Sequence, residues 1–121
     1  MSYVHFAFDT SAFKDDADTK SRNINELSGC ALATWLAGRL GARGFEVSEV
    51  WADDHGWDFA VTHGGRKFQC ACSINDDEEP VADAHVVIGP KATTSDALAA
   101  AIGAELGASS DVQNLSIDTA R

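Results

Sequence analysis

Long apolar runs are the first thing that this sequence of 121 residues lacks. No stretch approaches the roughly 18 to 20 uninterrupted apolar residues of a membrane-spanning helix. The opening MSYVHFAFDT has neither the basic region nor the long apolar region of a secretion signal. Cysteine is scarce as well, with three residues, an odd number, whose spacing does not fit a disulfide scaffold. We therefore expect a soluble, cytoplasmic protein with reduced thiols.

Basic residues are also few. Nine Lys and Arg residues stand against nineteen Asp and Glu residues, which gives a formal net charge of −10. Ten of the acids lie between Glu46 and Asp83, where only Arg66 and Lys67 oppose them, so this segment alone carries a net charge of −8. Contacts to phosphate need Lys and Arg, so the charge argues against direct binding to nucleic acid or to a membrane of anionic lipids. It favours a protein partner with a basic surface.

Patterns typical of catalysis are missing too. No paired carboxylates, Ser-His-Asp set or Gly-rich cofactor loop stands out in the chain. The four histidines do not have the H-x-x-x-H or H-E-x-x-H spacing that brings two imidazoles together. We predict no enzyme activity, no cofactor and no bound metal.

The strands are predicted from alternating apolar residues. Residues 3–8 form a first strand with Val4, Phe6 and Phe8 on its buried side. The segments FEVSEVWAD, GWDFAVTH and RKFQCACSI then read as a three-stranded meander, joined by the turns DDHG and HGGR. HVVIG, residues 85–89, predicts a further short strand, and VQNLSID, residues 112–118, an edge strand at the end of the fold.

Two helices are predicted from caps and helical spacing. Asn23 and Glu26 form a capping-box pattern, which predicts a helix over about 24–43 that ends at Gly44, after a loop over 9–22. A second helix follows a cap at Thr93 and Asp96 and ends near residue 107. The prediction is a single α+β domain over 1–121, in the order strand, helix, four strands, helix and a possible last strand. Its mainly antiparallel sheet of about five strands carries both helices on one face.

The two cysteines of RKFQCACSI share a strand face with apolar neighbours. Phe68, Cys70, Cys72 and Ile74 point to one side, because alternate residues of a strand do. Side chains at i and i+2 lie roughly 6 to 7 Å apart, too far for a disulfide. Packing in the core is the favoured interpretation, and a metal site the alternative. Cys30 is expected in the middle of the first helix, away from the N-terminal dipole that would activate a thiol.

Two further stretches leave alternatives open. DDHGWD gathers Asp53, Asp54, His55 and Asp58, which suits either a solvated turn or a metal or acid–base site. GPKATTSD, residues 89–96, brings Lys91 to a helix start where backbone amides can hold an anion. It lacks the G-x-x-x-x-G-K-[ST] pattern, so helix capping is the favoured interpretation.

The run LAGRLGARGFEVSEVWADDHGWDFAVTHGGRKFQCACS, residues 36–73, combines a helix that ends in a Gly-rich turn with a meander whose turn reads D-x-G-W. The turn residues are Asp54, Gly56 and Trp57. In this, about a third of the chain resembles small acidic bacterial domains of unknown or immunity-like function. The resemblance assigns no catalytic residue. It implies a protein that binds another protein, as immunity proteins and phage-encoded inhibitors do.

The leading hypothesis is a non-enzymatic module that binds and neutralises a partner protein with a basic surface. Its predicted binding residues are the acids and one aromatic residue around the sheet turn and the following loop: Asp53, Asp54, Trp57, Asp58, Asp76, Asp77, Glu78 and Glu79. Trp51, on the other side of the turn, is a further aromatic candidate. One alternative is a homodimeric structural or scaffold subunit that pairs through a flat sheet face of small residues or through an exposed edge. Another is a small enzyme or metal protein that uses His55, His85 and the cysteines.

Overall fold

The computed structural model describes residues 2–75 and 80–120. In chain order its elements are β1 (Tyr3–Thr10), α1 (Ala17–Ser21), α2 (Cys30–Ala42), β2 (Glu46–Val47), β3 (Trp51–Asp53), β4 (Gly56–His63), β5 (Arg66–Asn75), β6 (Ala82–Gly89), α3 (Ala97–Ala108) and β7 (Gln113–Ala120). The predicted α+β class is confirmed. The described part of the chain has seven strands and three helices, more than the five strands and two helices that the sequence predicts.

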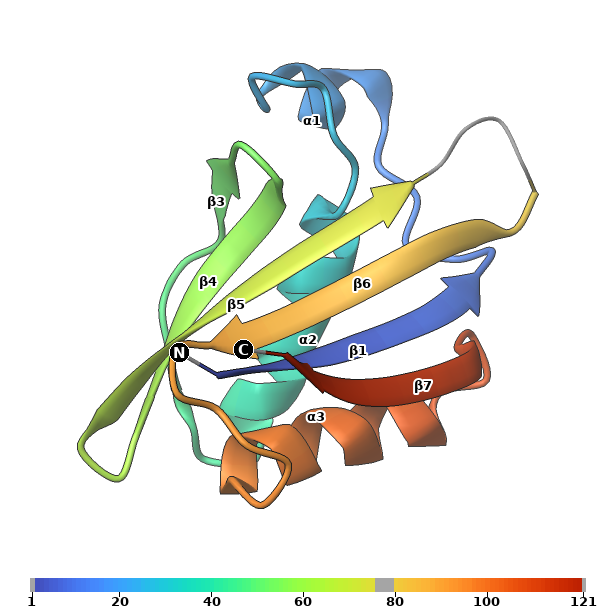
Figure 1. Ribbon diagram of the computed structural model, residues 1–121. Coiled ribbons are helices and arrows are strands. Elements are labelled where there is room, and N and C mark those ends of the chain that lie inside the picture. The colour runs from blue at the N-terminus through green and yellow to red at the C-terminus, as the bar shows by residue number, and fades with distance from the viewer. Residues whose placement is uncertain (1, 76–79, 121) are drawn as a thin grey trace.

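All strands belong to one antiparallel sheet. Its order is β2-β4-β5-β6-β1-β7, and β3 also pairs with β4. Figure 1 shows α2 and α3 on the same side of this sheet, with α3 running beside β7. The predicted strand FEVSEVWAD is split into β2 and β3, and the predicted last strand is confirmed as β7, which pairs with β1.

The core lies between the sheet and these two helices. On β1 the side chains of Val4, Phe6 and Phe8 are buried while those between them are only partly covered, as alternation predicts. Cys70 and Cys72 are buried on the same face, so the prediction that they pack in the core is confirmed. Burial raises the pKa of both thiols, which keeps them protonated and unreactive.

Glycine closes the hairpin between β4 and β5. Gly64 and Gly65 have φ angles of 59° and 75°, the left-handed values that a two-residue type I′ turn needs at both positions. The Gly-Gly hairpin predicted from HGGR is thereby confirmed.

Helix α2 begins six residues later than the capping-box pattern predicts. The residue before its first turn is Gly29, and Asp15, from the loop between β1 and α1, supplies the cap. Its carboxylate accepts hydrogen bonds from the backbone N–H groups of Gly29 (2.9 Å), Cys30 (2.8 Å) and Ala31 (2.8 Å). Three N–H groups that have no partner within the helix are satisfied in this way.

This start corrects the position of Cys30. It is the first residue of α2 and not a mid-helix residue as predicted. Burial raises the pKa of the Cys30 thiol, and the Asp15 charge raises it further. The thiol is therefore not activated, although it stands at the helix end that would otherwise lower its pKa.

The predicted loop over residues 9–22 contains the short helix α1. Asp16 caps it, accepting a hydrogen bond of 2.7 Å from the Thr19 backbone N–H. None of the α1 side chains is buried, so no apolar periodicity marks this helix in the sequence.

An ion cluster joins α2 to α3. Glu105, only 7% exposed, accepts from Arg39 at 2.8 Å and from Arg43 at 2.5 Å. Hydrogen bonds from Arg43 and Arg39 lower the pKa of Glu105, so it stays ionised between the helices. In the part of the chain that the structure describes, no helix has the length and apolar character needed to span a membrane.

Candidate functional site

The face of the sheet opposite α2 and α3, here called the open face, has no helix packed on it in the described structure (Figure 1). Its central side chains come from four neighbouring strands: Tyr3, His5, Ala7, Asp58, Ala60, Gln69, Ala71, Ser73, His85 and Val87. Most are small or polar, as the alternation of β4 and β5 predicts. This face is where side chains are available for function.

A groove crosses the open face beside β4. It has a volume of about 700 Å³ and is lined by Ser48, Glu49, Val50, Trp51, Ala60, Lys67, Phe68, Gln69 and Pro90. It forms because the chain between β2 and β3 leaves the regular ladder. At that point the Ser48 hydroxyl accepts the Ala60 backbone N–H at 2.8 Å. Residues 48–50 thus form one wall of the groove, and the open face forms its floor.

Trp51 is the large aromatic side chain of this groove. It lies on β3 directly opposite Asp58 of β4, and 38% of its surface is exposed. A hydrogen bond from the Trp51 side chain is one of the causes that lower the pKa of Asp53. Trp51 therefore lines the groove with a partly exposed ring, across the β3–β4 ladder from Asp58.

Asp53 and Asp58, on the neighbouring strands β3 and β4, are two carboxyl groups that influence each other's pKa. Asp58 is 2% exposed, and its Oδ2 accepts a 2.5 Å hydrogen bond from Gln69. Its Oδ1 is buried and has no hydrogen-bond partner among the described residues. Burial raises the pKa of Asp58 to about 6, and the neighbouring Asp53 charge adds to the effect. A hydrogen bond from the backbone N–H of Asp54, 2.6 Å long, lowers the pKa of Asp53.

The chemistry of this pair follows from these opposite shifts. Because the pKa of the buried Asp58 is raised and that of Asp53 is lowered, Asp58 is the member of the pair that takes up a proton first as the pH falls. The sequence shows both acids but not their pairing, which depends on the register of the β3–β4 hairpin.

Three polar residues form a chain elsewhere on the open face. Asp83 Oδ2 lies 2.8 Å from His85 Nε2, and His85 Nδ1 lies 2.7 Å from His5 Nε2. A proton on His85 Nε2 leaves Nδ1 to accept from His5, so one tautomer satisfies both bonds. His85 also lines a hollow of about 540 Å³ with His55 and Ser73.

This arrangement separates the residues of the metal-protein alternative. His55 and His85 border the same hollow, but Cys70 and Cys72 lie on the opposite, helix-covered face. The cysteines cannot join these histidines in one site. Among residues 2–75 and 80–120, no three His, Cys, Asp or Glu side chains gather closely enough to hold a metal ion.

The D-x-G-W turn anchors a loop. Asn23 Nδ2 donates to the carbonyl oxygens of Asp53 (2.9 Å) and Gly56 (2.8 Å). The Trp57 indole N–H donates to the Leu27 carbonyl at 2.9 Å. Gly56 has φ +150°, and a Cβ there would lie 2.2 Å from the Cys72 carbonyl oxygen, so glycine is required. Asn23 is therefore a tether between loop and hairpin and not the helix cap that its spacing with Glu26 predicts.

The predicted binding residues are not all accessible. Trp57 and Asp58 are buried, at 4% and 2% exposure, so their side chains are not accessible to a partner in this conformation. Asp53 is half-buried and Asp54 exposed. Asp76, Asp77, Glu78 and Glu79 lie outside the described residues.

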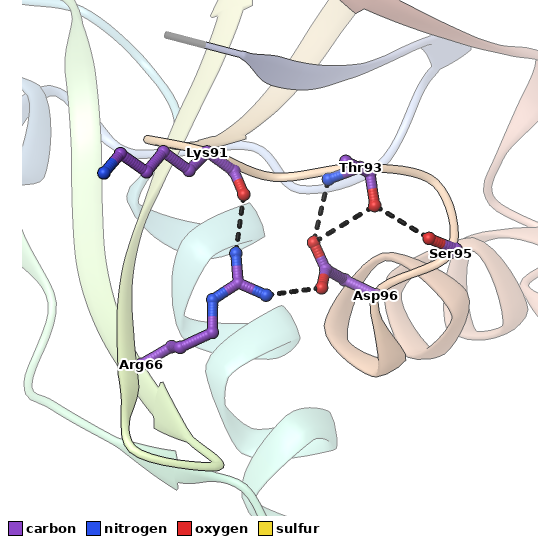
Figure 2. Close-up of polar contacts among 5 residues, drawn as sticks. All are labelled: Arg66, Lys91, Thr93, Ser95 and Asp96. Carbon is purple, nitrogen blue, oxygen red and sulfur yellow. Dashed lines mark hydrogen bonds and ion pairs between the residues drawn. The ribbon is translucent and has the colours of Figure 1, made fainter.

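Lys91 lies away from the start of α3. Arg66 donates to the Lys91 carbonyl at 2.6 Å and to the Asp96 carboxylate at 2.7 Å, and Asp96 also accepts from the Thr93 N–H at 2.8 Å. Figure 2 shows the Lys91 ammonium directed away from this cluster. Asp96 is the residue before the first turn of α3, but its carboxylate accepts from Arg66 and Thr93 and makes no capping hydrogen bond to the helix, so the predicted side-chain cap is not formed.

Sequence reasoning missed most of the groove. Trp51 was a candidate, but Glu49, Val50 and Gln69 gave no separate signal. One signal was present: the apolar alternation of Phe45 and Val47 breaks before Val50, which is typical of a bulge.

No protein-family model, curated protein sequence or solved structure matches this chain. The resemblance of its D-x-G-W meander to immunity-like domains thus stays a prediction. The site must be interpreted from its own geometry.

Proposed function

We propose that the chain is a non-enzymatic module that binds another protein on its open face, with an apolar side chain of the partner seated in the groove against Trp51. The observation that carries this proposal is the groove of about 700 Å³ on a sheet face that no helix covers in the described structure. Trp51, Val50 and Ala60 give it apolar walls, and Gln69 gives it a polar floor. Half-exposed aromatic residues at such hollows are typical anchors of protein interfaces.

Charge supports a basic partner. Glu49 lies at the groove, and Asp53 and Asp54 lie on the adjoining β3–β4 hairpin. These acids belong to the segment from 46 to 83 that carries a net charge of −8. Lys67 also lines the groove, but these acids outnumber it, and an excess of one sign of charge attracts a partner of the opposite sign, an attraction that salt screens. The partner segment is therefore an apolar residue flanked by Lys or Arg.

The role of such binding follows from the resemblance. An acidic module of the immunity-like or inhibitor-like class covers the basic working surface of its partner and thereby neutralises it. The three unpaired cysteines support a reducing compartment such as the cytoplasm for this activity.

Capture from cells of the source organism tests the proposal. Tagged wild type and the variants Trp51→Ala, Trp51→Phe and Ile24→Ala are compared at low and at high salt. Ile24 is a matched control because it is 82% exposed and lies outside the groove. We expect wild type, Trp51→Phe and Ile24→Ala to capture one partner in stoichiometric amount. Trp51→Ala should capture at least tenfold less of it, and high salt should weaken the binding in every case.

Two outcomes contradict the proposal. One is that no protein is retained by wild type. The other is a partner that Trp51→Ala retains as well as Ile24→Ala does, because such a partner binds elsewhere on the molecule.

A further inference from the structure

The outer edge of β7 is an open edge of the sheet. Within residues 2–75 and 80–120, β7 pairs with β1 on one side and with no strand on the other (Figure 1). Every second residue of such a strand directs its N–H and C=O groups away from its neighbour. Natural edge strands are protected by proline, lysine or very short length. β7 has eight residues, no proline, no lysine and a single charge, at Asp118.

An apolar surface adjoins this edge. Ile117 of β7 is 47% exposed and borders a hollow of about 220 Å³ between β7 and α3, which Phe6, Ala99, Ala100 and Gly103 also line. On the outward side of α3 the residues at Ala100, Gly103, Ala104 and Gly107 are all small. Another helix could approach α3 closely along this side.

We propose that a second copy of this chain pairs with the open edge, β7 against β7 in antiparallel orientation, so that two sheets join into one. A two-fold axis perpendicular to the sheet keeps the helices of both copies on the same face. Residues that lie opposite each other must then belong to the same face, so one residue of β7 faces its own copy at the axis.

The register follows from the regularity and charge of β7. Its pairing with β1 is continuous from Ser116 to Ala120, with a shift between Ala7 and Asp9 and a positive φ of 56° at Asn114. The centre of the regular part is Asp118, and Ile117 is the residue next to it. An axis at Asp118 would set two carboxylates directly opposite each other, which destabilises a pair of strands. An axis at Ile117 pairs two exposed isoleucines and places each Asp118 opposite Ser116.

The charge distribution is compatible with this pairing. Each copy has a net charge of −10, and the acids Glu46, Glu49, Asp53, Asp54 and Asp58 lie on β2 to β4 and their connections, at the other side of the sheet from β7. Pairing through β7 sets these acids of the two copies at the far ends of the combined sheet. It also leaves the groove at Trp51 free, so the dimer does not depend on the proposed function.

The oligomeric state tests this inference. Sedimentation velocity is measured over a wide concentration range for wild type, Ile117→Lys and Ile24→Lys, which exchange the same residue type at two exposed positions. We expect wild type and Ile24→Lys to sediment with twice the chain mass of 12.8 kDa and Ile117→Lys with the single mass. Trp51→Ala should stay dimeric, which separates this result from the binding test.

Cross-linking gives a second readout if Ile117→Lys fails to fold. Ile117→Cys should form covalent dimers with a short thiol-reactive bismaleimide, because the two side chains face each other at the axis, whereas Ile24→Cys should not. A wild-type chain that is monomeric at every concentration overturns the inference. So does a dimer that folded Ile117→Lys retains or that Ile117→Cys does not cross-link.

Discussion

The two faces of the sheet differ in what their side chains do. On β5, the covered face carries Phe68, Cys70, Cys72 and Ile74, none more than 5% exposed. The open face of the same strand carries Gln69, Ala71 and Ser73, which are small or polar. Gln69 is exposed, and Ala71 and Ser73 are half-buried. One strand therefore contributes hydrophobic burial on one side and accessible chemistry on the other.

This difference teaches where substitutions are tolerated. Burial of apolar area on the covered face supplies most of the stability, and little of it comes from the open face. The exception is Asp58, whose carboxyl is buried on the open face although a charge is unfavourable there. Residues of the open face can thus be substituted to suit a binding partner without loss of the fold.

A pair of identical substitutions on β6 tests the contrast with the largest expected effect. Val86 is fully buried on the covered face, and Val87, next to it, is half-buried on the open face. Val86→Ala should lower the free energy of unfolding by about 2–3 kcal/mol, because it leaves a cavity in the core. Val87→Ala should lower it by less than about 1 kcal/mol. Urea denaturation of both variants measures the difference, and equal losses would show that the open face is packed like the core.

The buried carboxyl of Asp58 makes the contribution of the open face to stability depend on pH. The folded state raises the pKa of Asp58 from 3.8 to about 6, so it holds this proton more tightly than the unfolded chain does. The stabilisation is complete below about pH 4 and is lost as pH rises through 6. Asp58→Asn keeps an acceptor for Gln69 and cannot ionise.

The free energy of unfolding of Asp58→Asn minus that of wild type should therefore rise by about 2 kcal/mol as the pH is raised from 4 to 8. Denaturant titrations of both proteins across this range measure the gain. A difference between the two proteins that does not change with pH would contradict the raised pKa of Asp58.

Substitution of the α2 cap tests how the helix that covers the sheet is stabilised, and a smaller loss of stability is expected. Asp15→Ala removes the acceptor of three backbone N–H groups and should cost about 1–2 kcal/mol. Asp16→Ala is the matched control, because that carboxylate caps only the exposed α1 and should cost less than about 0.5 kcal/mol. Thermal unfolding of the two variants compares them. A larger loss in Asp16→Ala would contradict the assignment of the α2 cap to Asp15.

Local patterns in the sequence predict the strands well. Val4, Phe6 and Phe8 alternate with partly covered residues, and burial follows this period of two. The Gly-Gly turn likewise specifies its hairpin by local backbone chemistry. Such features depend on neighbours in the chain, and the sequence carries all of their information.

Long-range partners decide the features that the sequence predicts wrongly. Asn23 and Glu26 have the spacing of a capping box, but the Asn23 amide binds carbonyl groups 30 and 33 residues away. The helix cap comes from Asp15, which lies 14 residues before Gly29. Nothing in the local sequence marks either choice.

The candidate site shows the same division. The alternation along β4 and β5 predicts which side chains face away from the helices, and Trp51 is recognisable as an aromatic residue beside acids. The groove itself and the Asp53–Asp58 pair depend on the break between β2 and β3 and on the β3–β4 register. These are tertiary properties that spacing alone does not encode.

The most direct test of the central claim, that the open face is the binding face, is hydrogen–deuterium exchange of the chain with and without the partner that wild type captures. We predict slower exchange in residues 48–53 and in the part of β5 beside the groove, with no change in α2. Protection of α2 or α3 together with unchanged exchange in 48–53 would contradict the account, since the partner would then bind the helix layer.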